Sequence, residues 1–287
     1  MNEFIQSVLL GIVEGLTEFL PVSSTAHLRI TEALMKIPLD DPYWKMYTIV
    51  IQLGAILALC LLFLGRIVGF MRSFPKGENG DRNWLNHPIS LTAIAFVFTS
   101  GPALLLHKWS EKNLGSLQAM SLALLVGGIA MWIIDAWASR REASTLEVEQ
   151  MSLPQAIWIG LCQTLSAVFP GTSRSMSTIA AGQLVSLDRP AALEFSFLLS
   201  IPTMIAATGW DLVKEIHPTH GAAAHVVMNG NNWIVLLIGV VVSFIVALGV
   251  VEWFLFWVRK HGFTIFAIYR ILLGAALLLF GAKYIGG

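Results

Sequence analysis

Two segments that lie 149 residues apart decide the fold of this sequence: Gly11-Ile12-Val13-Glu14-Gly15-Leu16-Thr17-Glu18-Phe19-Leu20-Pro21-Val22-Ser23-Ser24 and Gly160-Leu161-Cys162-Gln163-Thr164-Leu165-Ser166-Ala167-Val168-Phe169-Pro170-Gly171-Thr172-Ser173. In each copy a short apolar stretch is broken by proline and is followed by hydroxyl residues. Paired, interrupted hydrophobic segments in the two halves of a membrane protein point to a site at the interface of the halves.

The composition is that of a polytopic membrane protein. Of the 287 residues, 56% are hydrophobic and only 13% are charged, whereas an average soluble domain is about a quarter charged. The formal net charge is zero, so no overall field favours binding to nucleic acid. The two cysteines, Cys60 and Cys162, lie inside apolar runs and form neither a metal motif nor a disulfide framework.

Apolar runs predict an all-α protein with about six spanning helices. A spanning helix needs about 20 mostly apolar residues, and six runs are long enough: roughly 46–64, 89–106, 116–138, 191–210, 232–257 and 265–285. Residues 4–36 and 153–187 each contain two shorter apolar pieces around the repeated motif, and we expect both to be re-entrant helix hairpins. The prediction is one membrane domain made of inverted repeat halves, approximately 1–145 and 146–287.

Three spans lie between the two hairpins, so the second is expected to be inverted and the two tips to meet near the midplane. Short-loop lysines and arginines indicate the orientation. There are six on the side of the first hairpin and nine on the other: Lys36, Lys45, Lys108, Lys112, Lys214 and Lys283, against Arg66, Arg72, Lys76, Arg82, Arg140, Arg141, Arg189, Arg259 and Lys260. This predicts that the second side is cytoplasmic and that both termini are outside.

Two acids in the first hairpin are candidates for chemistry. Glu14 and Glu18 are four residues apart, so they share a helical face with Thr17. Ionisable groups inside a membrane are functional candidates by default. The pair could hold a divalent cation, Mg²⁺ or Ca²⁺, or one of them could be a general base. The alternative is an interfacial helix whose acids face water.

Hydroxyl residues and a histidine follow the first helix break. After Pro21 come Ser23, Ser24, Thr25 and His27. Proline ends one helix and serine or threonine caps the next, so the hydroxyls could be caps only. His27 lies about one turn further on and titrates near neutrality. Beside two acids, this arrangement favours catalysis.

The second break carries an arginine instead of acids. Gly171, Thr172, Ser173, Arg174 and Ser175 open a helix whose N–H groups can bind an anion. A guanidinium adds a bidentate clamp for phosphate. The alternative is a structural bridge from Arg174 to an acid of the first hairpin. Arg174 could have both roles, if it forms the bridge in the empty site and binds phosphate instead when substrate is present.

Other polar residues in or near the apolar runs are weaker candidates for the site. Gln52 and Glu194 lie within spans, where they could line the same cavity or pair with arginine. Arg270, Glu252 and Asp211 lie near span ends, where snorkelling or pairing with loops is expected.

Both motifs resemble signatures of a known family. Glu14–His27 is similar to the acidic signature of the undecaprenyl-diphosphate phosphatases, the bacitracin-resistance membrane family, and Pro170–Ser175 is similar to the second signature. Further similarity runs through Ile51–Leu57, Glu194–Leu199 and Phe266–Arg270, so the resemblance covers nearly the whole chain.

The resemblance implies a bacterial inner-membrane enzyme with an outward-facing active site and a divalent cation requirement. Its reaction would remove the terminal phosphate from the C55 polyprenyl diphosphate carrier, which recycles the carrier for peptidoglycan synthesis. Bacitracin competes for this substrate, so the reaction confers resistance. The enzyme would work in the bilayer, and it could be a homodimer.

Site residues follow from the motifs and the resemblance together. We expect catalytic roles for Glu18, Ser24, His27 and Arg174, and a metal at Glu14 and Glu18. Either Ser24 or a water could be the nucleophile. Substrate binding is assigned to Ser23, Thr25, Gln52, Gly171, Thr172, Ser173, Arg174 and Ser175.

Three positions depart from the family pattern, and two other functions compete. The family usually has glycine where this chain has Ala26 and Met176, and an acid where it has Thr48. These departures bear on pocket width, substrate range and turnover. A polyprenyl-phosphate flippase could use the same inverted-repeat cavity, and an inactive lipid-binding homologue is the third possibility. Phosphate release by purified protein distinguishes the enzyme from both.

Overall fold

The computed structural model describes residues 2–39, 41–77, 80, 82–113, 116–216 and 228–284; the side chains of 107–113, 214–216 and 282–284 are outside this description. Within the described part, the protein is all-α, as predicted, and the only extended pairing is an isolated bridge between Thr145 and Leu187.

Six helices of the described residues are long and apolar enough to cross a membrane. They follow the six predicted runs in order: α3 (Pro42–Leu62), α5 (Pro88–Asn113), α6 (Leu117–Ala138), α9 (Arg189–Ile216), α10 (Gly230–His261) and α11 (Thr264–Tyr284). Several extend beyond the apolar run because a polar cap starts them earlier, such as Asp41 for α3 and Asn229 for α10. The chain is a multi-pass membrane protein.

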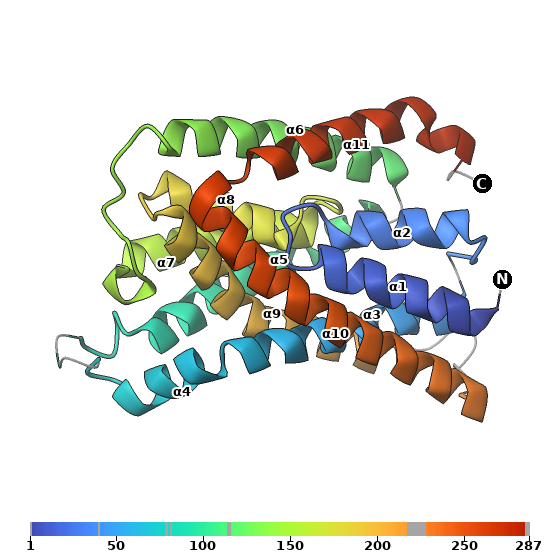
Figure 1. Cartoon of the computed structure of the whole chain (residues 1–287), viewed down its shortest axis with the longest axis horizontal. Helices are drawn as coiled ribbons and strands as arrows, with labels where there is room; N and C mark the ends of the chain where they lie inside the picture. Colours follow the sequence, from blue (N-terminus) through green and yellow to red (C-terminus); the bar gives the residue numbers. More distant parts are fainter. Residues whose placement is uncertain are drawn as a thin grey trace.

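The two predicted hairpins are each a pair of helices too short to span. The first is α1 (Glu3–Thr17) with α2 (Ser24–Leu34), and the second is α7 (Leu153–Val168) with α8 (Arg174–Leu184). Figure 1 shows the α1–α2 turn and the α7–α8 turn facing each other near the middle of the molecule. The outer ends of α1 and α2 lie at the end that carries both termini, whereas those of α7 and α8 lie at the opposite end.

In both hairpins a proline follows the first helix and a serine caps the second. Pro21 and Pro170 follow the ends of α1 and α7, where a helix cannot continue normally. Ser23 and Ser173 then cap α2 and α8, with side chains that accept from the N–H groups of Ala26 and Met176, both at 3.4 Å. Both serines have a positive φ, 76° and 71°, a region that non-glycine residues seldom occupy. The two turns therefore share an unusual backbone conformation.

Each hairpin packs on a spanning helix through a close crossing. Gly15 of α1 lies against the Ser243 carbonyl of α10, where an added Cβ would be 2.7 Å from the oxygen. In the other half, Thr164 of α7 donates to the Thr99 carbonyl of α5 at 3.4 Å. Small residues allow such approaches in membranes. Because Gly15 and Thr164 differ by the 149-residue repeat offset, the crossings favour the prediction of repeat halves.

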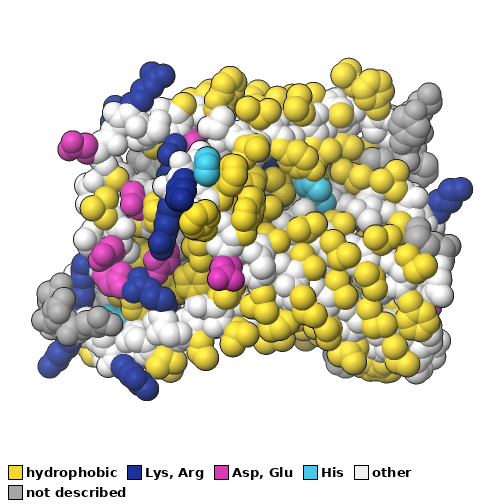
Figure 2. All heavy atoms as spheres, in the orientation of Figure 1, with side chains coloured by type: hydrophobic (Ala, Val, Ile, Leu, Met, Phe, Trp, Pro, Cys, Tyr) yellow, Lys and Arg dark blue, Asp and Glu magenta, His cyan; other side chains and the backbone are white. Residues whose placement is uncertain are grey.

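A short helix and a 3₁₀ turn complete the chain. The helix α4 (Leu64–Ser73) continues from α3 after a break at Phe63, and η1 (Val148–Gln150) lies between α6 and α7. Figure 2 shows charged side chains gathered at this end of the molecule and hydrophobic side chains over much of the visible surface. Large apolar side chains such as Leu272 are 64% exposed, as expected for a surface that faces lipid.

The arrangement of the loops agrees with the predicted topology. The last turn of α4, which contains Arg72, and the loop after α6, which contains Arg140, lie at the end opposite the two termini (Figure 1). Of the residues used to predict orientation, four have side chains outside the described residues: Lys108, Lys112, Lys214 and Lys283.

Candidate active site

The two hairpin turns meet through polar contacts. Arg174 Nη2 donates to Glu18 Oε1 at 3.1 Å, although the residues are 156 positions apart. A second contact runs from Ser175 Oγ to the Leu20 carbonyl at 3.0 Å. The side chains of Arg174 and Glu18 are only 12% and 9% exposed. The bridge that was the alternative interpretation of Arg174 is present, and Glu18 is its acid.

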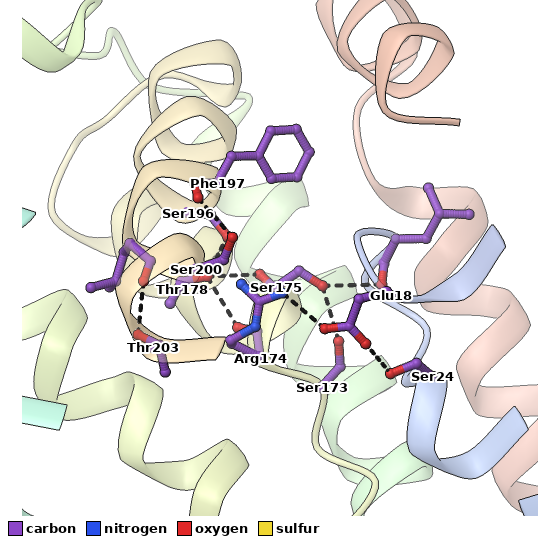
Figure 3. Close-up of polar contacts among 12 residues, drawn as sticks. Glu18, Ser24, Ser173, Arg174, Ser175, Thr178, Ser196, Phe197, Ser200 and Thr203 are labelled. Carbon is purple, nitrogen blue, oxygen red and sulfur yellow. Dashed lines mark hydrogen bonds and ion pairs between the residues drawn. The ribbon is translucent and has the colours of Figure 1, made fainter. Parts of the chain in front are cut away.

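Glu18 is the centre of the site. Its other oxygen, Oε2, accepts from Ser24 Oγ at 2.5 Å. Figure 3 shows the carboxylate between Ser24 of α2 and Arg174 of α8. One carboxylate therefore connects the candidate nucleophile of one hairpin with the candidate phosphate ligand of the other.

Two buried charged groups at the site have unused hydrogen-bonding capacity. Arg174 Nη1 has no hydrogen-bond partner in the described part of the chain. The same holds for each of the two carboxylate oxygens of Glu14. Glu14 is fully buried, one helical turn before Glu18. Buried polar groups normally have partners, so unsatisfied donors and acceptors at one site indicate that a ligand completes it.

Some hydroxyl groups of the two turns cap helices or bind backbone, whereas others are free of such structural roles in the described structure. The Ser23 and Ser173 hydroxyls serve as helix caps, as the alternative interpretation of the sequence expects. Thr172 Oγ1 donates to the Phe169 carbonyl at 2.8 Å. Thr25 is exposed, and Ser24 is the hydroxyl of this turn that contacts an acid.

Gly171 has a backbone role in the second turn. Its φ is 90°, and an added Cβ would be 2.7 Å from the Met120 carbonyl of α6. Glycine is therefore needed for conformation and for the close approach of α6. The substrate-binding role of Gly171 stays a prediction, and the close approach seen in the structure is to another helix.

His27 is held at both ring nitrogens. Nδ1 lies 2.7 Å from the Ser23 carbonyl, and Nε2 lies 2.6 Å from the hydroxyl of Tyr269 in α11. The two rings are stacked, with centroids 5.6 Å apart. No hydrogen bond joins His27 to Ser24 or Glu18 in the described structure. Tyr269 was not selected from the sequence as a site residue, because an isolated tyrosine near a span end is usually an interfacial anchor.

Arg270 hydrogen-bonds to the backbone of both turns. It is fully buried, and its two terminal nitrogens donate to the carbonyls of Pro21 (3.1 Å), Ala123 (3.2 Å), Gly171 (3.3 Å) and Thr172 (2.9 Å). The prediction that Arg270 snorkels is wrong, whereas the alternative, pairing with a loop, is met by its bonds to the carbonyls of the two turns. Packing of α11 against α6 directs this side chain into the protein, where backbone carbonyls replace water.

Comparison with known proteins agrees with this geometry. The family described as "Bacitracin resistance protein BacA" matches residues 7–276 of the chain. The chain belongs to this family. A relative named undecaprenyl-diphosphatase from Koribacter versatilis is 58% identical over 286 residues, which cover 99% of this chain and all of the relative. Relatives of the same name from Caldanaerobacter subterraneus and Thermus thermophilus are each 41% identical, over 99% and 96% of this chain and 98% and 96% of their own.

The divalent cation that membership of the BacA family leads us to expect has a compatible donor set. Glu14 offers two buried oxygens without partners, and carboxylate oxygen is the ligand that Mg²⁺ and Ca²⁺ prefer. The described residues contain no group of three His, Cys, Asp or Glu side chains that could form a complete protein site. Two carboxylates nevertheless suit Mg²⁺, which usually keeps several waters and binds substrate phosphate as well.

Two other predicted residues of this BacA-family chain lie apart from these contacts. Glu194 pairs with Arg66 of α4 at 2.6 Å, and Arg66 also binds Glu149 at 2.6 Å. The prediction that Glu194 pairs with an arginine is confirmed, but the partner is at the α4 end. Gln52 is half-buried on α3, and no hydrogen bond of its side chain is seen within the described residues.

The three departures from the family pattern have different surroundings. Ala26 is fully buried in an apolar cluster with Met120 and Leu124. Met176 is buried, and its terminal methyl group packs against Gly127. A Cβ added to Gly127 would be only 2.8 Å from this methyl group. Thr48 donates to the Lys45 carbonyl of its own helix at 2.9 Å. The two added side chains thus fill apolar space, and neither is one of the residues that contact Glu18.

Proposed function

We propose that the chain is an undecaprenyl-diphosphatase, which hydrolyses undecaprenyl diphosphate to undecaprenyl phosphate and inorganic phosphate. The relatives named above carry this name over nearly the full length of the chain. The observation that most supports it is the buried Ser24–Glu18–Arg174 connection, which combines a hydroxyl, a base and a phosphate ligand from the two hairpins.

Substrate binding in this proposal begins with Arg174. Its unpartnered Nη1 and the N–H groups that open α8 bind the terminal phosphate. The phosphate replaces Glu18 as partner of Arg174, so the ion pair of the empty site gives way to a bidentate contact. Positive charge at this position stabilises the negative charge that shifts to the leaving oxygen during phosphoryl transfer.

Proton transfer falls to Glu18. Ser24 already donates to its carboxylate, so Glu18 can take the Ser24 proton as Oγ attacks the terminal phosphorus. The P–O bond to undecaprenyl phosphate breaks, and the lipid product leaves with the bridging oxygen. Water then hydrolyses the phosphoserine to regenerate Ser24. If water attacks the diphosphate directly, Glu18 accepts its proton in the same way.

His27 is the second acid–base group of the proposal. Tyr269 and the Ser23 carbonyl fix its ring beside the Ser24 turn, and exchange of a proton at Nε2 would link it to Tyr269. A bound Mg²⁺ or Ca²⁺ would be held by Glu14 and Glu18, where it supplies positive charge to the diphosphate oxygens.

The cellular setting is also proposed. We infer a location in the bacterial inner membrane, with the active site open to the outer face, because cationic loop residues are more numerous at the α4 end. Removal of diphosphate would recycle the lipid carrier for peptidoglycan synthesis. It would also lower the amount of the diphosphate form of the carrier, for which bacitracin competes. We further propose one membrane domain built of repeat halves 1–145 and 146–287, and a homodimer as a possible assembly.

The matching crossings of the two hairpins favour one rival, a flippase of polyprenyl phosphate. Phosphate release separates the two functions. Purified protein in detergent should release inorganic phosphate from undecaprenyl diphosphate, and added Mg²⁺ or Ca²⁺ should increase the rate. Arg174→Ala should be inactive. Absence of phosphate release by the unsubstituted protein under every cation condition would refute the phosphatase and leave the flippase or an inactive lipid-binding protein.

A further inference from the structure

A polar cavity lies at the end of the molecule where α6 and α10 end and α9 begins. Its volume is about 240 Å³, and its polar lining includes Gln183, Asp188 and three arginines, Arg141, Arg189 and Arg259. None of these residues contributes to the Glu18–Arg174 site. We propose that this cavity binds the phosphate of an anionic phospholipid headgroup.

A buried aspartate behind the lining holds two of its polar side chains, Gln183 and Arg189. Asp135 is 1% exposed and accepts from Arg189 Nε (2.8 Å) and Nη2 (3.0 Å), from Gln183 Nε2 (2.8 Å) and from the Phe263 N–H (3.1 Å). These contacts fix the Arg189 guanidinium in one plane and join α6, α8, α9 and the α10–α11 junction. Arg189 Nη1 makes no hydrogen bond to a described residue. An immobilised guanidinium with free donors suits an incoming phosphate oxygen.

The remaining charges leave the cavity cationic. The Arg141 guanidinium lies 4.1 Å from the ring centroid of Trp137, and neither it nor Arg259 forms an ion pair within the described residues. The one acid of the lining, Asp188, accepts from the Ala191 N–H at 2.7 Å and so caps α9. Burial raises the pKa of the Asp188 carboxyl above its ordinary value.

The position in the fold indicates a lipid rather than a soluble ligand. Four spanning helices end or begin around the cavity: α6 at Ala138, α9 at Arg189, α10 at His261 and α11 at Thr264. Trp137 and Trp257 lie at the same helix ends, and tryptophan is enriched at the level of lipid headgroups. Basic pockets between spanning helices at this level bind anionic headgroups.

The test uses the whole purified chain in detergent with lipid-doped micelles. Thermal unfolding is measured with phosphatidylglycerol, phosphatidylcholine or sodium phosphate, and lipid retention is measured by native mass spectrometry. The test variant is Arg141→Gln with Arg259→Gln. The control, Arg72→Gln with Arg140→Gln, removes the same charge from the same end but outside the cavity lining. All four side chains are exposed, so both variants should fold.

Phosphatidylglycerol should raise the unfolding temperature of the unsubstituted chain and of the control, because a ligand that binds only the folded state stabilises it. The test variant should need at least about tenfold more phosphatidylglycerol for the same shift, as expected when two charge-assisted contacts are lost. Equal responses of the two variants would overturn the site, since they would show attraction by net charge alone. An equal shift with phosphatidylcholine, or with sodium phosphate at the same concentration, would overturn the anionic lipid as its ligand.

Discussion

Replacement of Arg270 by methionine should separate the two turns of the active site. Methionine fills a similar apolar volume but donates no hydrogen bond. In the native structure, Arg270 donates to the carbonyls of Pro21, Gly171 and Thr172 in the two turns and to that of Ala123 in α6. We therefore expect the loss of one side chain to disturb both hairpins at once.

The magnitude follows from two opposing effects. Each buried carbonyl left without its donor costs about 1–3 kcal/mol, and three of the four lie in the turns. Removal of a buried charge recovers several kcal/mol of desolvation. We expect a net destabilisation of about 2–4 kcal/mol. Activity should fall by about a hundredfold, because a displacement of about 1 Å at a catalytic group has this effect.

The assay combines kcat/KM for phosphate release with the thermal unfolding midpoint, both in detergent. Arg270→Lys is the matched variant, since one ammonium cannot reproduce contacts that come from two separate guanidinium nitrogens. It should fold better than Arg270→Met but should also lose activity. Unchanged kcat/KM in Arg270→Met would refute the idea that this arginine positions the two turns.

Three further predictions concern the phosphate ligand, the acids and the topology. Arg174→Lys should lose nearly as much phosphate release as Arg174→Ala, because a point charge lacks the planar fork; near-normal activity would exclude the bidentate role. Glu18→Gln should abolish divalent-dependent activity and Glu14→Gln should raise the cation concentration needed, as titration with Mg²⁺ or Ca²⁺ would show; unchanged titrations would place the cation elsewhere. In a cysteine-free background, cysteines at Ser73 and Ser144 should both resist impermeant thiol reagents added outside intact cells, and labelling from opposite sides would contradict the span count between them.

The fold was predictable because its signals are local. Broken apolar segments around Pro21 and Pro170 predict two hairpins, and the six long runs predict the spans, since neither inference needs to know which helix packs on which. The Arg174–Glu18 bridge was also accessible, because an arginine and an acid in paired motifs each need a partner inside a membrane.

What the sequence could not provide is the direction of individual helix faces. Arg270 is one charge in an apolar helix, and only the packing of α11 shows that it turns inward to the carbonyls of both turns. Likewise, Tyr269 contacts His27 across 242 positions without any motif to connect them. Glu194 is paired with Arg66 because α4, which continues from α3, places this arginine beside α9, an arrangement that apolar periodicity does not encode.

The central claim is that the two hairpin turns form one active site, and a double-mutant cycle between Glu18 and Arg174 tests it most directly. The kcat/KM for phosphate release from undecaprenyl diphosphate would be measured for Glu18→Gln, Arg174→Gln and the double variant. Residues that act as one unit are non-additive, so the double variant should be about as slow as the slower single variant. Losses that multiply in the double variant would show that the two residues act independently, and would contradict a shared site.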